Sequence, residues 1–126
     1  MSFRSPLSKA YGLGSAKDGT HHFMIQRLTG IALVPLMLWL TFSIACLGGA
    51  DLASVRDFIA NPLNATLLIC LTVSVFYHSS LGMQVVLEDY LRPHWLRLTV
   101  QILINFANFA LAVVSILAIL KLAVAA

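Results

Sequence analysis

Long apolar runs separated by short polar segments dominate the chain. Three of these runs contain no charged residue: Leu28–Ala50, Phe58–Leu87 and Thr99–Leu120. A helix needs about 20 consecutive apolar residues to cross a bilayer. Its backbone must be helical, because hydrocarbon offers no partner to a free N–H or C=O group. The pattern therefore predicts an all-α membrane protein with three transmembrane helices.

The ends of the runs suggest where the helices begin and stop. We expect a polar tail over residues 1–20, followed by a three-helix membrane domain over residues 21–126. Within that domain the helices are expected at about residues 23–49, 64–88 and 98–123.

Capping residues and prolines refine these boundaries. Thr20 or Asp18 is suited to cap the first helix, because a short polar side chain accepts a hydrogen bond from the free N–H groups there. Pro62 interrupts the second run, so we expect the second helix to begin just after it.

Composition narrows the class of protein. Of the 126 residues, 60% are hydrophobic and only 10% are charged, and the mean hydropathy is +0.90. A soluble domain has about 25% charged residues, so a soluble fold is excluded, and the chain is too apolar to be disordered. The net charge of +3 comes from few, scattered basic residues, which indicates membrane topology rather than nucleic-acid binding.

The basic residues also predict an orientation. Six of them fall on one side of a three-span chain: Arg4, Lys9, Lys17, Arg27, Arg92 and Arg97. Two, Arg56 and Lys121, fall on the other. Cytoplasmic segments carry the excess of Lys and Arg, so the N-terminus is expected to be cytoplasmic. The C-terminus is then expected in the periplasm if the membrane is a bacterial inner membrane, or in the intermembrane space if the chain is organellar. The two cysteines, Cys46 and Cys70, lie in apolar runs and are expected to be small buried hydrophobic residues rather than a disulfide pair.

One titratable residue lies deep within a predicted span. His78 stands ten residues before Glu88, which places it about 15 Å from that end of the helix. It is open whether His78 is a hydrogen-bond partner between helices or an axial haem ligand, because imidazole binds iron and haem needs an apolar slot. No other histidine lies at a comparable depth, so a second ligand is expected from another subunit.

Two polar clusters lie at the predicted cytoplasmic face. The cluster at the end of the second helix contains Asp89 and Tyr90, which fit either an anchor at the lipid headgroups or a site where a substrate meets protons. The cluster at the start of the first helix contains His21, His22 and Arg27. Arg27 fits either a phosphate contact or a buried anion such as a haem propionate.

Taken together, the clusters resemble a known family. The segment His-Phe-Met-Ile-Gln-Arg-Leu-Thr-Gly (22–30) is followed by the spacing His78–Gly82–Asp89–Tyr90 and by Arg-Pro (92–93). This set is similar to the hydrophobic membrane anchor subunits of succinate dehydrogenase, respiratory complex II. The tail segment 12–20 is similar to that of alphaproteobacterial members. The resemblance covers about residues 11–100, and the third helix matches only in character.

The resemblance implies a role in quinone reduction. It implies that the chain works with the flavoprotein, iron–sulfur and cytochrome b subunits of complex II, and that it shares a b-type haem with the last of these. His78 is then one axial ligand of the haem iron, and Arg27 lies near the haem propionates and the quinone pocket. Tyr90 hydrogen-bonds a ubiquinone carbonyl, with Asp89 beside it on the proton route. His21 or His22 is the family histidine at the start of the first helix.

Other functions remain open at this point. The chain has no flavin motif and no cluster-binding cysteines, so it is expected to be non-catalytic alone. A close variant is the anchor of a fumarate reductase, because the direction of the reaction depends on the partners and the quinone. The alternatives from other classes are a cofactor-free structural membrane subunit and a small subunit of a transport complex.

Overall fold

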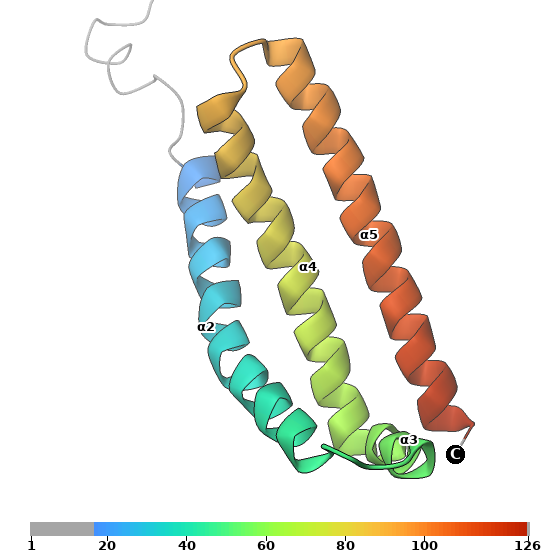
Figure 1. The fold of residues 1–126 in the computed structure, drawn as a ribbon. Coiled ribbons are helices and arrows are strands. Elements are labelled where there is room, and N and C mark those ends of the chain that lie inside the picture. Colours follow the sequence, from blue (N-terminus) through green and yellow to red (C-terminus); the bar gives the residue numbers. More distant parts are fainter. Residues whose placement is uncertain (1–16, 126) are drawn as a thin grey trace, which may run out of the picture.

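The computed structural model describes residues 17–125, and this range contains four helices (Figure 1). They are α2 (Lys17–Cys46), α3 (Leu52–Ala60), α4 (Pro62–Tyr90) and α5 (His94–Val124). The long helices α2, α4 and α5 are long and apolar enough to cross a membrane. The predicted all-helical fold with three candidate spans is therefore confirmed, whereas the short helix α3 was not expected.

The first helix begins earlier than the hydrophobic run. Because α2 starts at Lys17, residues 17–20 are helical rather than part of the polar tail predicted over 1–20. Thr20 and Asp18 both lie inside the helix, so neither is the residue that precedes it as its N-cap. The hydrophobic run marks the part of a helix that suits lipid, whereas the helix itself continues into polar residues. Arg4 and Lys9, on which the orientation partly depends, lie outside the described residues.

The loop after α2 depends on a glycine. The helix ends at Cys46 rather than near residue 49, and Gly49 has a φ of +84°. This left-handed conformation costs glycine little and disfavours other residues, which is why glycine often follows the end of a helix. The chain then reverses and enters α3.

Polar caps define the helix α3 and the start of α4. The carboxylate of Asp51 accepts hydrogen bonds from the N–H of Ser54 (3.1 Å) and from its hydroxyl (2.6 Å). Asn61 ends α3 and caps α4 by accepting from the N–H of Leu63 at 2.9 Å. Pro62 is the first residue of α4 rather than its predecessor, because the first helical position needs no N–H donor.

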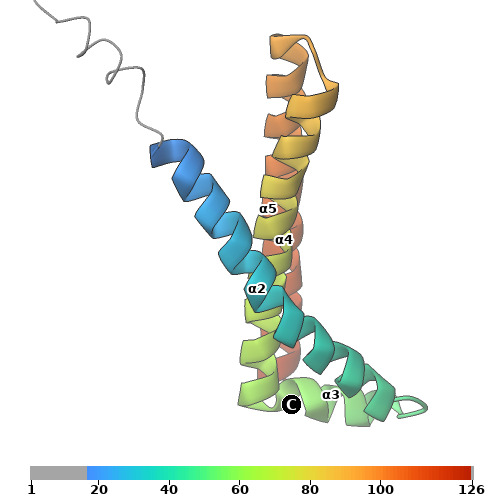
Figure 2. The same cartoon turned by 90° about the vertical axis from the view of Figure 1, so that its left-hand side faces the viewer.

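The long helices are arranged around α4. Helices α2 and α5 each pack against α4 but not against each other within the described residues. Figure 1 shows α4 between the other two, and Figure 2 shows that α2 crosses α4 obliquely while α5 runs along it. Helix α3 lies across one end and contacts α4 and α5. This arrangement leaves broad helix faces uncovered.

Burial within the chain is sparse. Among the described residues the buried side chains are Ala65, Leu71, Leu87 and Ser43. Large apolar side chains such as Phe42 (71% exposed), Phe106 (70%) and Phe109 (71%) point outward. Such a surface is stable only against lipid or another apolar protein surface. The fold is therefore that of a membrane protein rather than of a domain with its own core.

Candidate functional site

The crossing of α2 and α4 places His78 against the first helix. Its side chain is half-buried, and its Nδ1 lies 3.1 Å from Oγ1 of Thr29. Gly30, the next residue, has no side chain, and a Cβ built there lies 3.4 Å from Cε1 of the imidazole. The ring therefore rests directly on the backbone of α2. Within residues 17–125 no hydrogen-bond partner of its Nε2 is found.

A second close approach lies one helical turn nearer the α4–α5 loop. A Cβ built at Gly82 lies 3.7 Å from Nε2 of Gln26, which is an ordinary van der Waals distance, so the side chain of Gln26 packs over this glycine. The Oε1 atom of Gln26 is enclosed and has no hydrogen-bond partner. Gln26 is thus the side chain of α2 that lies over Gly82.

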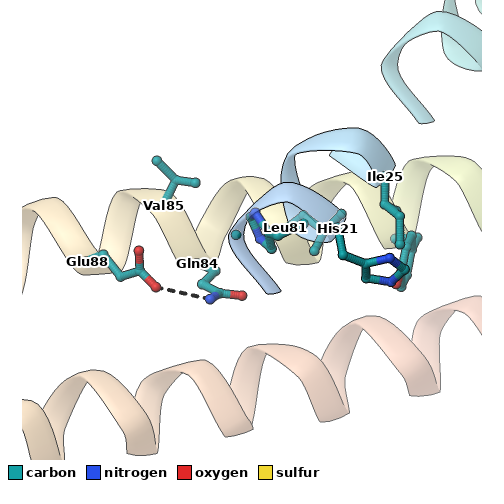
Figure 3. A pocket seen from close by; sticks show the side chains of 9 residues that line it. His21, Ile25, Leu81, Gln84, Val85 and Glu88 are labelled. Carbon is teal, nitrogen blue, oxygen red and sulfur yellow. Dashed lines mark hydrogen bonds between the residues drawn. The ribbon is translucent and has the colours of Figure 1, made fainter. Parts of the chain in front are cut away.

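Beyond this crossing, a hollow of about 550 Å³ opens between the start of α2 and the last turns of α4 (Figure 3). His21, His22 and Ile25 line it from α2, and Leu81, Gln84, Val85 and Glu88 line it from α4. Figure 3 shows the hydrogen bond from Gln84 to Glu88, with Nε2 and Oε1 3.0 Å apart.

Both histidines at the start of α2 thus contribute to the hollow. The side chain of His21 is exposed. His22 is half-buried, and its Nε2 is enclosed without a hydrogen-bond partner. An enclosed polar atom without a partner is costly, so one wall of this hollow contains a polar group that the fold of the described residues leaves unsatisfied.

The other predicted site residues lie outside the hollow. Tyr90, the last residue of α4, is 81% exposed, and Asp89 beside it is also exposed. Arg27 is exposed too, and its guanidinium carbon lies 4.8 Å from the centre of the Phe23 ring. None of these three lines the hollow. The chain therefore presents them outward, at the same end of the molecule as His21 and Glu88.

One polar group was missed by the sequence reasoning. Gln101, Asn105 and Asn108 follow a helical spacing along α5, and Asn105 accepts hydrogen bonds from Ser80 of α4 and from Nε2 of Gln101. Oε1 of Gln101 and Nδ2 of Asn108 are enclosed without partners. The sequence signal that could have revealed this cluster was the position of three amide side chains on one face of an apolar span. Polar side chains within spans tend to face other helices.

Among the described residues no three His, Cys, Asp or Glu side chains gather to hold a metal ion. A single imidazole is enough for one side of a haem. Cys46 and Cys70 are free and exposed within this chain, so the expectation that they are buried is wrong.

Comparisons with known proteins agree with this architecture. Residues 1–120 match the family described as succinate dehydrogenase/fumarate reductase transmembrane subunit. The succinate dehydrogenase hydrophobic membrane anchor subunit of Rickettsia bellii is 36% identical over 93% of this chain and 94% of its own length. The subunit of the same name from Rickettsia conorii is 36% identical over 82% of each chain. A succinate dehydrogenase membrane anchor subunit of Reclinomonas americana is 30% identical over 59% of this chain and 64% of its own length.

Proposed function

The chain belongs to the succinate dehydrogenase/fumarate reductase transmembrane subunits, with the hydrophobic membrane anchors of succinate dehydrogenase among its relatives, and we propose that it helps to bind haem b and to form the ubiquinone-reduction site of such a complex. Its partners are then the flavoprotein, iron–sulfur and cytochrome b subunits. The chain anchors them in the bacterial inner membrane and contributes no catalytic residue of its own to succinate oxidation.

The observation that carries this proposal is the environment of His78. Its Nδ1 is tied to α2 while its Nε2 has no partner among the described residues, and the Gly30 backbone leaves the ring room. These features fit an axial imidazole ligand, whose second nitrogen is usually hydrogen-bonded. A haem bound at this position would accept and donate one electron at a time. The cytochrome b subunit would supply the other ligand of the haem iron.

Polar groups nearer the end of α4 suit the propionates and the quinone. Arg27 and the histidine pair His21 and His22 lie on the first turns of α2, where cationic and N–H groups can meet propionate oxygens. Tyr90 donates its hydroxyl proton in a hydrogen bond to a ubiquinone carbonyl, and Asp89 relays protons from water. Reducing ubiquinone to ubiquinol takes up two electrons and two protons, so a site at the end of a span, close to water, suits the reaction.

The direction of the reaction follows the relatives. The family includes both succinate dehydrogenases and fumarate reductases, whereas the relatives described above carry the succinate dehydrogenase name. We therefore favour succinate oxidation coupled to ubiquinone reduction.

The count of Lys and Arg residues supports a cytoplasmic N-terminus. A reporter fused after Ala126 is expected to be periplasmic, and a cytoplasmic reporter overturns this orientation.

Purification of the complex tests the proposal. A tag on this chain should recover the three partner subunits, and dithionite reduction should give the absorption bands of a b-type haem. The same preparation should reduce ubiquinone with succinate. Recovery of the dehydrogenase subunits without any haem spectrum overturns the haem assignment, and recovery of the chain without those subunits overturns the anchor role.

A further inference from the structure

A short chain of hydrogen bonds links the ring of His78 to the backbone of α2. Nδ1 of His78 lies 3.1 Å from Oγ1 of Thr29. The Thr29 hydroxyl lies in turn 2.9 Å from the carbonyl oxygen of Ile25 and 3.1 Å from that of Gln26, in the preceding turn. Both distances are within the usual range for hydrogen bonds. The imidazole on α4 is therefore oriented by a residue of another helix.

The protons in this chain can be counted. A threonine hydroxyl has one proton to donate and two lone pairs to accept with. The Thr29 proton is directed to the carbonyls of its own helix, which are acceptors only. The contact with His78 is then satisfied when Nδ1 carries a proton and donates it to Thr29 Oγ1. A neutral imidazole protonated at Nδ1 has its free lone pair on Nε2.

We propose that Thr29 is a positioning residue that fixes the Nδ1–H tautomer of His78 and so keeps the Nε2 lone pair available to the haem iron. This inference rests on the proposed function, in which His78 is an axial ligand. Ligating histidines generally donate their other N–H to an oxygen acceptor, which fixes the ring and makes the imidazole a stronger ligand. Thr29 is that acceptor in this chain.

The neighbouring residue supports the same role. Gly30 places backbone, rather than a side chain, under the ring edge at Cε1. Thr29 therefore holds one atom of the ring while Gly30 leaves the space that the ring needs to reach it. The two adjacent residues of α2 fix both the rotation and the tautomer of a side chain on α4.

Helix α2 offers a matched control. The hydroxyl of Thr41 donates to the carbonyl of Met37 at 2.8 Å, which is the same intrahelical bond that Thr29 makes. Thr41 is exposed and its hydroxyl has no imidazole partner. Replacing each threonine by valine removes the same hydroxyl with little change of shape, and only Thr29→Val removes the acceptor of His78.

The experiment compares the complete purified complex carrying Thr29→Val, Thr29→Ser, Thr41→Val or His78→Leu with the wild type. Haem per complex and the midpoint potential of the haem are measured by spectroscopic redox titration. Succinate oxidation by an artificial acceptor reports assembly. Thr29→Val should lower haem affinity by about tenfold, and the haem it retains should have a higher midpoint potential, because a weaker imidazole donor stabilises ferric iron less. Thr29→Ser should restore both properties, and Thr41→Val should match the wild type.

The outcomes distinguish the role of Thr29 in fixing the tautomer from the assignment of His78 as a haem ligand. If His78→Leu loses haem but Thr29→Val keeps both the haem content and the potential of the wild type, the tautomer proposal is overturned while the ligand assignment stands. If His78→Leu keeps its haem, the ligand assignment falls and the tautomer proposal falls with it. If Thr29→Val fails to assemble, the smaller variant Thr29→Ala replaces it, with the same expected loss of affinity and rise in potential.

Discussion

The two ends of the helix assembly formed by α2, α4 and α5 differ in how many of their polar groups have hydrogen-bond partners within the chain. At the end that carries α3, Asp51 caps α3 and the Asn64 side chain donates to the carbonyl of Phe58 at 2.9 Å. The ring of Phe58 stacks on Trp39 of α2 with centroids 6.0 Å apart. At the opposite end, Nε2 of His22 and Oε1 of Gln26 are enclosed without partners.

This difference distinguishes polar groups that stabilise the fold from polar groups that the chain leaves without a partner. Polar groups that find partners inside one chain stabilise its fold, and enclosed polar atoms without partners cost free energy. The end that carries α3 thus satisfies the polar groups named above within the described residues, whereas the end with His22, Gln26 and the exposed Tyr90 is the one at which we propose that a cofactor and a substrate bind.

The largest effect is expected from filling the space under His78. Gly30→Leu places side-chain atoms where the imidazole rests, because even a Cβ there lies 3.4 Å from the ring. We expect haem affinity to fall by about 10–100-fold, measured as haem per purified complex. Gly82→Ala is the control, since its Cβ meets only the flexible end of Gln26 at 3.7 Å. Normal haem content in Gly30→Leu would show that His78 does not need its contact with α2.

The next effect concerns the exposed tyrosine. Tyr90→Phe removes one hydroxyl from a side chain that has no other partner in the described part of the chain, so the fold should be unaffected. Loss of one hydrogen bond to the ubiquinone carbonyl should lower kcat/KM for quinone by about tenfold. Succinate oxidation with an artificial acceptor is the control and should stay normal. Unchanged quinone kinetics would remove Tyr90 from the quinone site.

A smaller effect is expected at the end that carries α3. Trp39→Leu removes the stacked ring pair with Phe58 and should destabilise the fold by about 1 kcal/mol, seen as a lower apparent Tm of the complex. Quinone reduction at moderate temperature should not change. Trp95→Leu is the matched control, because Trp95 has no stacked ring among the described residues. An equal loss of Tm in both variants would contradict a specific role for the stack.

The smallest effect is the pH dependence of the α3 cap. The hydrogen bonds from the Ser54 side chain and N–H lower the pKa of Asp51 from its ordinary value of 3.8. The pKa of Asp51 is therefore lower in the folded protein than in the unfolded chain. The cap contributes its full stability at pH values above the ordinary pKa, and this stability is lost as the pH falls through the folded pKa. Limited proteolysis near α3 should therefore accelerate only in acid. Asp51→Asn should abolish this acid dependence, and an unchanged profile in that variant would assign it to another group.

The sequence predicted the parts of the molecule that depend on hydrophobicity. Three uncharged runs gave the three spans, and the isolation of His78 in one of them singled out the titratable residue that α2 holds. The helix ends were less well predicted, because α2 extends into polar residues and Pro62 starts a helix rather than preceding it. Helix α3 was missed because its nine residues are too few to give a membrane-spanning run.

The contacts between helices were beyond the sequence. Nothing in the spacing of residues within one helix says which turn of α2 meets His78, so the pairing with Thr29 and Gly30 required the structure. The hollow itself was not predicted from the sequence, which placed the polar residues of α2 and α4 only at one end of the molecule. His21 and His22 line the hollow, whereas Arg27, Asp89 and Tyr90 do not.

The central claim is that His78 of this chain is a ligand of the haem iron in the assembled succinate dehydrogenase. The most direct measurement is the reduced-minus-oxidised spectrum of the purified complex that carries His78→Leu, with all subunits present and succinate oxidation by an artificial acceptor intact. We predict that the low-spin b-type bands of the wild type are lost or converted to a high-spin form. A variant spectrum identical to that of the wild type would contradict the claim.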